Sequence, residues 1–247
     1  MAHKGKITLS IRAIFLFALA TMSVSCAAKY VTPGAGVNLQ AINEQSIKER
    51  FETKPASPFP VRLAVVRIQQ SGYYSHGNQS YGGGRFSVVT TRDIEDDEQF
   101  EKIKSLRDIE GLTTLNRILI PSDLQGIKDL REAAASLHAD MLLVYTLDTS
   151  FRVKGQSLGP LSLISLGFLP NKEANVTTTA SGVVYDVRTG YIYGMIEQTH
   201  KTTQLASIWS TTQAIDNSRL ETEKGAFNRL VNEFPDVWDG ILKEYKK

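Results

Sequence analysis

The sequence has one cysteine, Cys26, among its 247 residues. A single cysteine excludes an intrachain disulfide and any zinc site built from several thiolates. Histidine is also scarce: His3 lies near the N-terminus, and His76, His138 and His200 follow at intervals of 62 residues. None belongs to an HExxH motif, so there is no local metal-binding pattern. We therefore predict no metal and no cofactor.

Motifs for catalysis and nucleotide binding are missing as well. The GGGR segment at 82–85 lacks the Lys-Ser/Thr pair of a phosphate-binding loop and precedes an expected strand. No serine lies in a nucleophile-elbow context. The acidic run 95–98 is expected to be the solvated start of a helix. We predict that the protein is not an enzyme, with a soluble periplasmic enzyme or ligand-binding protein as an alternative.

The chain has no excess of charge of one sign. Its 28 basic and 26 acidic residues give a formal net charge of +2. Three basic residues, Lys4, Lys6 and Arg12, and no acidic ones precede Cys26, so removing residues 1–25 changes the charge from +2 to −1. Nucleic-acid binding is therefore not expected. The apolar fraction of 42% is sufficient for a folded core.

The N-terminal segment is basic, then apolar from Ile11 to Val24, and then small, which is the order of a secretory signal peptide. The apolar run is shorter than the ~20 residues of a spanning helix. We predict a signal peptide at 1–25, with a retained N-terminal anchor as the alternative.

The stretch Ser23-Val24-Ser25-Cys26 resembles the lipobox of bacterial lipoproteins, in which the cysteine becomes the lipidated first residue, although Ser23 stands where Leu is usual. We predict lipidation of Cys26; cleavage by ordinary signal peptidase after Ser25 or Ala28 is the alternative. The residue after the cysteine is not Asp, which resembles outer-membrane routing. The expected location is the cell envelope, with the protein on the outer membrane facing the periplasm.

Composition divides the remaining chain into two parts. Residues 26–60 contain several prolines and glycines and are interpreted as a lipidated N-terminus and tether, with a short helix within 38–51 carrying Leu39, Ile42 and Ile47 on one side. Residues 61–247 are interpreted as one α/β domain that ends in helices.

Hydrophobic periodicity assigns the elements of this domain. Strands are expected at 61–69, 86–91, 117–121, 141–153, 175–187 and 191–205, and a loop at 71–85. The last two strands flank Arg188-Thr189-Gly190, a hairpin signal. Helices are expected around 96–110 and at 123–137, with Ser122 as the N-cap of the latter, and two more at the C-terminus, the second of which begins at Pro235. The predicted fold class is α/β (α+β), a mixed β-sheet with helices packed mainly on one face.

Short motifs add a family resemblance. Ala139-Asp140 ends an alanine-rich helix before a long strand, Asp186-Val-Arg-Thr189-Gly190 ends a later strand, and Ala64-Val65 lies in the first strand. This arrangement resembles the curli-secretion lipoprotein (CsgG-like) family, with its relatives the periplasmic activator lipoprotein of penicillin-binding proteins and the N-terminal domain of the Tol–Pal beta-propeller protein. The resemblance implies an α/β domain on an envelope lipoprotein, but the pore protein's membrane-spanning hairpins are not evident.

An uncharged, apolar stretch, GQSLGPLSLISLGFLPN at 155–171, separates two expected strands. It either packs on the domain as a satellite cluster or forms an exposed tip that contacts a membrane or partner. The candidate contact residues are Leu158, Leu161, Leu163, Ile164, Leu166, Phe168 and Leu169. The predicted function is a lipid-anchored periplasmic module in envelope assembly, maintenance or secretion, which binds an envelope protein or itself; the alternative is an oligomeric outer-membrane secretion pore component.

Overall fold

The computed structural model describes residues 29–75, 78–79, 81–153, 156–159, 163–165, 173–205 and 211–246. The predicted signal peptide and Cys26 lie outside these residues. Within them the protein is a mixed α/β structure with a seven-stranded sheet and helices mainly on one face, which confirms the predicted fold class.

The sheet has the strand order β13-β12-β9-β2-β6, with β10 added to β9 and β7 added to β2. Strand β2 runs parallel to β7 and β9, and all other pairs are antiparallel. The strands are β2 (Val61–Gln70), β6 (Phe86–Val89), β7 (Ile109–Thr114), β9 (Met141–Val153), β10 (Gln156–Leu158), β12 (Glu173–Asp186) and β13 (Ile192–Leu205).

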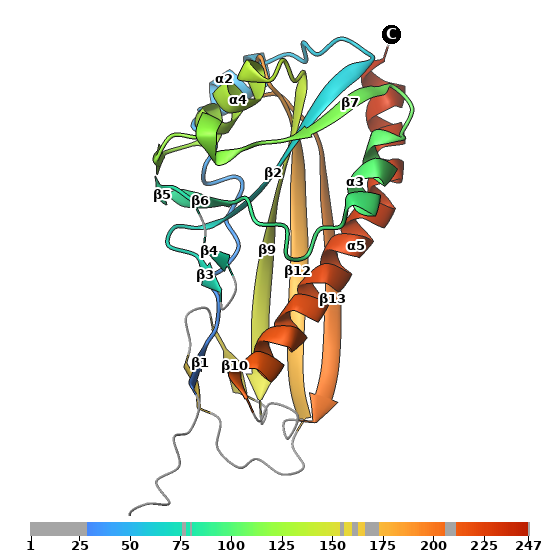
Figure 1. The fold of residues 1–247 in the computed structure, drawn as a ribbon. Helices are drawn as coiled ribbons and strands as arrows, with labels where there is room; N and C mark the ends of the chain where they lie inside the picture. Colours follow the sequence, from blue (N-terminus) through green and yellow to red (C-terminus); the bar gives the residue numbers. More distant parts are fainter. Residues whose placement is uncertain are drawn as a thin grey trace, which may run out of the picture.

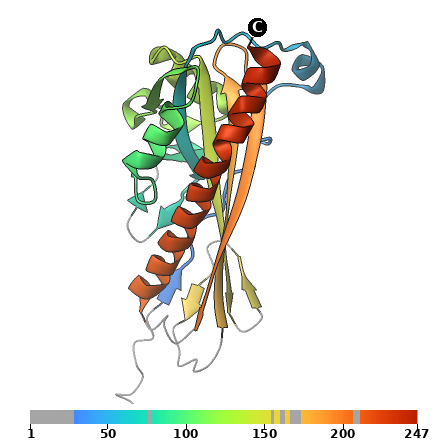
Figure 2. The same cartoon turned by 90° about the vertical axis from the view of Figure 1, so that its right-hand side faces the viewer.

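Strands β9, β12 and β13 extend well past the other strands and make the molecule elongated (Figures 1 and 2). β12 and β13 pair antiparallel from Glu173↔Leu205 to Tyr185↔Ile192, as predicted for the hairpin around Arg188-Thr189-Gly190. Gly190 has a φ of +78°, and a Cβ there would lie 2.9 Å from Arg131 Nη1. The turn therefore requires glycine.

Helix α5 (Thr212–Tyr245) crosses one face of the sheet along nearly its whole length, beside α3 (Asp97–Lys104) (Figure 2). The shorter helices α2 (Ile47–Glu52) and α4 (Ile127–Ser136) lie at one end of the molecule, and α4 packs on the opposite face. Apolar side chains fill both faces of β2 and β9, so two separate core clusters sandwich the centre of the sheet.

The C-terminal region is one helix of 34 residues, so the prediction of two helices divided at Pro235 was wrong. Proline removes one backbone donor, but Val231, Phe234 and Trp238 on either side of it are all buried against the sheet. The rings of Phe234 and Trp238 stack with centroids 6.1 Å apart. A buried face that continues through the proline holds the helix together.

The third strand was placed incorrectly. Residues 109–114 form β7, whereas Arg117–Leu119 is a short 3-10 helix, and α3 ends at Lys104. Helix α4 begins at Ile127 instead of Asp123, and its N-cap is Gly126 instead of Ser122, because β8 (Asp123–Leu124) pairs with β5 (Gly83–Gly84). The expected loop 71–85 also contains a small hairpin of β3 (Tyr74–Ser75) and β4 (Asn78–Gln79).

The segment interpreted as a tether is part of the folded domain from Lys29 onward. Leu39 and Ile42 are buried in the core cluster on the α4 face, and Ile127 N donates to Ile42 O at 3.0 Å. Tyr30 is also buried. A free stalk was predicted from proline and glycine content, but these few apolar residues are enough to hold the segment on the sheet.

Candidate functional site

A cluster of buried charges lies between the sheet and α5. Arg67 of β2 contacts Asp93 Oδ1 at 2.8 Å, Glu95 Oε1 at 3.5 Å and Glu223 Oε2 of α5 at 3.6 Å. Arg219 of α5 also pairs with Glu223 and Asp216, the latter at 3.0 Å. We call these six residues, Arg67, Asp93, Glu95, Asp216, Arg219 and Glu223, the ion network.

Hydrogen bonds tie the ion network to the strands. Thr149 Oγ1 of β9 donates to Glu223 Oε1 at 2.9 Å, and Tyr145 OH donates to Glu95 Oε1 at 2.6 Å. Burial raises the pKa of Glu95, against the opposing influence of Arg67 and the Tyr145 hydroxyl. Burial also opposes the charged form of Arg67, but Glu95 and the other nearby groups outweigh it and raise its pKa. The charges therefore depend on one another to remain buried.

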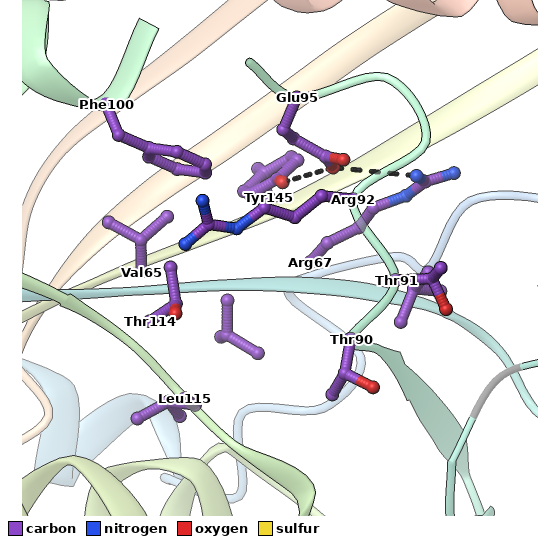
Figure 3. A pocket seen from close by; sticks show the side chains of 12 residues that line it. Val65, Arg67, Thr90, Thr91, Arg92, Glu95, Phe100, Thr114, Leu115 and Tyr145 are labelled. Atoms are coloured by element: carbon purple, nitrogen blue, oxygen red, sulfur yellow. Dashed lines mark hydrogen bonds and ion pairs between the residues drawn. The ribbon is translucent and has the colours of Figure 1, made fainter. Parts of the chain in front are cut away.

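A small hollow opens beside the ion network (Figure 3). Thr90, Thr91 and Arg92 line its rim, and Glu95 and Tyr145 its base, where they are joined to Arg67. Its volume is about 40 Å³, whereas one water molecule occupies about 30 Å³ of liquid. The hollow can therefore hold water. We interpret the ion network as a link between β2, β9 and α5.

The sequence prediction missed the ion network and placed Glu95 in a solvated acidic run, whereas its side chain is only 3% exposed. The signals available were a charged residue, Arg67, within the otherwise apolar run 63–68, and the i,i+4 spacing of Arg219 and Glu223. Neither signal reveals by itself that the two segments meet.

The motif residues behind the family resemblance also have structural roles. Asp186 Oδ1 accepts from the backbone of Arg188 and Thr189, and Oδ2 accepts from Ala56 N at 2.7 Å and Tyr193 OH at 2.8 Å. Asp140 Oδ2 accepts from Arg62 N at 3.0 Å, and Oδ1 from Arg188 Nη2 at 2.8 Å. The Asp186 carboxylate therefore stabilises the turn after β12, and the Asp140 carboxylate holds the residue before β9 against β2.

The end of the molecule at which β9, β12 and β13 extend farthest also holds the start of the described chain. Strand β1 (Lys29–Val31) pairs antiparallel with β11 (Leu163–Ser165), and Lys29 lies opposite Ser165. We call this the anchor end, because Lys29 is three residues after Cys26, the residue predicted to carry the lipid. Figures 1 and 2 place it opposite α2, α4 and the C-terminus.

A small core cluster closes the anchor end. Tyr30, Phe151, Ala174, Val176 and Ile215 are buried there, and Tyr30 OH donates to Asp216 Oδ1 at 3.1 Å. The ring of Tyr30 meets that of Phe151 edge-on, with centroids 5.9 Å apart.

The predicted contact residues fall in three groups. Ile164 is 6% exposed within this small cluster, and Leu158 is half-buried against it, so at these two positions the chain packs as a satellite cluster and does not form an exposed tip. Leu163 belongs to β11. The remaining residues, Leu161, Leu166, Phe168 and Leu169, lie outside the described part of the chain, as does Cys26.

At the far end, α2 carries an exposed apolar pair. Ile47 and Phe51 lie one helical turn apart and are 74% and 82% exposed. Ile47 was expected to share a side with Leu39 and Ile42, but these two lie before the helix and are buried separately. The exposed pair is therefore a surface feature and takes no part in the core.

Neither a metal site nor a membrane-spanning helix is found within the described ranges. No group of three or more His, Cys, Asp or Glu side chains there is arranged to hold a metal ion. None of the helices described is long and apolar enough to cross a membrane.

Comparisons with known proteins yielded no family model and no curated protein that matches the chain. The solved structures that are similar include protein XCC0632 of the DUF330 family from Xanthomonas campestris, at 10% identity and a TM-score of 0.37, and the hypothetical protein CT253 from Chlamydia trachomatis, at 12% identity and a TM-score of 0.26. The alignments cover 77% and 76% of this chain, and 93% and 98% of those chains. Similarities this low carry no functional argument, and the resemblance to the curli-secretion group stays a prediction.

Proposed function

We propose that the protein is a lipid-anchored interaction module of the bacterial cell envelope, held to the outer membrane through Cys26 and facing the periplasm. The observation that carries this proposal is the pairing of β1 with β11 at the anchor end. A chain of three residues spans at most about 11 Å, so an acyl group on Cys26 would be attached close to Lys29. The lipid and the described parts of the apolar stretch, 156–159 and 163–165, then share one end of the molecule.

An anchor at one end leaves the opposite end to face the periplasm. There α2 presents Ile47 and Phe51, which are both largely exposed. Large apolar side chains that project together from a short helix are suited to enter a pocket on a partner protein. We propose that α2 is the contact for an envelope protein, or for a second copy of this chain.

Cell fractionation tests the anchor. Cys26→Ser should move the protein from the membrane to the soluble periplasmic fraction and abolish labelling by a fatty-acid analogue, because two or more acyl chains are needed for stable anchoring. A Ser variant that stays in the membrane would show that the anchor lies elsewhere. Stable conductance of the lipidated protein in planar bilayers would favour the secretion-pore alternative instead.

Crosslinking in intact cells tests the contact. Phe51→Asp should remove the crosslinked product while the protein remains in the membrane and keeps its melting temperature. The matched control is Met195→Asp, since Met195 is 70% exposed but lies on β13. Equal loss of product in both variants would contradict a contact at α2.

A further inference from the structure

Among the described residues no element covers the sheet face opposite α5 at the anchor end, and a polar hollow of about 270 Å³ lies on this face. Four strands contribute to this hollow, and its lining consists of hydroxyl groups, one amide and two cations. We call it the basic hollow; its residues are Ser150, Arg152, Ser157, Asn175, Thr177 and Lys201.

Strand register explains how these residues meet. Arg152 of β9 lies between Ser157 of β10 and Asn175 of β12. Thr177 of β12, one step along, pairs with Lys201 of β13. Alternate residues share a face, so both cations point to the side away from α5. They lie two strands apart, about 10 Å across the sheet, which their long side chains can bridge.

The two cations have no anionic partner among the residues that the structure describes. Within the described residues neither Arg152 nor Lys201 forms an ion pair, whereas Arg67 and Arg219 each pair with carboxylates of the ion network. Asp148 and Glu173 share the same face but do not line the hollow. The negative charges of Asp148 and Glu173 weaken the attraction of the two cations for a distant anion. An anion therefore has to enter the hollow to interact favourably with both cations.

From this geometry we infer that the basic hollow binds the phosphate group of an anionic lipid headgroup. A guanidinium and an ammonium group surrounded by hydroxyl and amide donors are the groups that recognise phosphate oxygens. The inference rests on the proposed membrane anchor, since the anchor end would hold the hollow near the headgroup layer. Residues 26–247 carry a net charge of −1, which does not favour a general attraction to anionic surfaces.

Vesicle binding tests this inference without the acyl group. The mature chain carrying Cys26→Ser is sedimented with vesicles of phosphatidylcholine, alone or mixed with phosphatidylglycerol. Binding to the mixed vesicles should weaken about fivefold with Arg152→Gln or Lys201→Gln, and roughly 25-fold with both, since each surface cation near anionic lipid contributes on the order of one kcal/mol. The double control Lys48→Gln and Lys128→Gln removes the same charge from α2 and α4 and should leave binding unchanged.

The outcomes separate the hollow from the anchor. Equal weakening by the control pair would overturn the inference and indicate unspecific electrostatics. Inorganic phosphate is also added in place of vesicles, and the melting temperature is then measured. A phosphate-induced increase that is lost in Arg152→Gln, in a protein that does not bind vesicles, would overturn the lipid headgroup as the source and identify free phosphate as the ligand. If Cys26→Ser fails to release the protein in cells but vesicle binding depends on Arg152 and Lys201, the anchor proposal fails and the hollow stands. If Cys26→Ser releases the protein in cells but the protein does not bind the mixed vesicles, the anchor proposal stands and the inference about the basic hollow fails.

Discussion

Arg67 on β2 and Glu223 on α5 lie 3.6 Å apart, from Nη2 to Oε2, and join the middle of the sheet to the long helix. Both side chains are 1% exposed. A charge pair this deep is costly to form, and removing one partner leaves the other without compensation. Helix α5 is therefore held to the sheet by apolar packing together with charges that require each other.

The first prediction concerns the removal of this arginine. Arg67→Met should lower the free energy of unfolding by about 3–5 kcal/mol, because Asp93, Glu95 and Glu223 lose their shared cation. Urea denaturation monitored by tryptophan fluorescence measures the change. The control Lys48→Met breaks a surface pair with Glu52 and should cost less than about 1 kcal/mol. Similar costs for the two variants would contradict a structural role for the ion network.

The second prediction concerns Asp186 and pH. Burial opposes the charged form of Asp186, but hydrogen bonds from Ala56, Thr189, Tyr193 and Ser57 outweigh it and lower its pKa. A carboxylate with a lowered pKa stabilises the fold fully above its unfolded value of about 3.9. This stabilisation is lost as the pH falls through the lower folded pKa.

Asp186→Asn should therefore cost about 2–3 kcal/mol at neutral pH, since the amide nitrogen cannot accept from Ala56 N and Tyr193 OH. The difference from the unchanged protein should shrink below about pH 3.9, as measured by denaturation at several pH values. Asp239→Asn, at a side chain that is 71% exposed, is the control and should change stability little. A difference that persists at low pH would rule out the carboxylate charge as its source.

The third prediction separates packing from exposure at the anchor end. Ile164→Asp should destabilise the protein by several kcal/mol, because the side chain is 6% exposed in the small cluster with Tyr30 and Phe151. Val31, on the strand paired with β11, is 52% exposed, and Val31→Asp should stay within about 0.5 kcal/mol. Thermal unfolding compares the two variants. Equal stability of both would mean that β11 does not support the fold.

Hydrophobic periodicity correctly predicted strands that pair with the next strand in the sequence and strands with a long apolar pattern. The whole of β9 and the hairpin of β12 and β13 were predicted with nearly the observed bounds. The ion network could not be predicted, because Arg67 and Glu223 are far apart in sequence and meet only through the packing of α5. Residues 29–60 were misjudged for a similar reason: proline and glycine indicate irregular backbone, but they do not show whether that backbone lies on a sheet.

The last prediction compares two glycines of the same helix. Gly→Ala within a helix normally stabilises by about 1 kcal/mol. Gly240→Ala should do so, because no described atom outside the adjacent residues and the helix's own backbone lies within 4 Å of the added Cβ. At Gly225 an added Cβ would lie 2.3 Å from His200 Cδ2 of β13. The absence of a side chain at Gly225 therefore lets α5 approach this edge strand closely.

Gly225→Ala should accordingly destabilise the protein by about 1–3 kcal/mol, as expected for overpacking. The double variant Gly225→Ala with His200→Ala should recover most of this loss, because the smaller side chain gives the new methyl group room. His200 Nδ1 is buried and makes no hydrogen bond within the described residues, so the histidine substitution removes no such bond at that atom. Denaturation of the four proteins as a double-mutant cycle gives the coupling energy. Additive effects would show that α5 and β13 do not approach each other at this glycine.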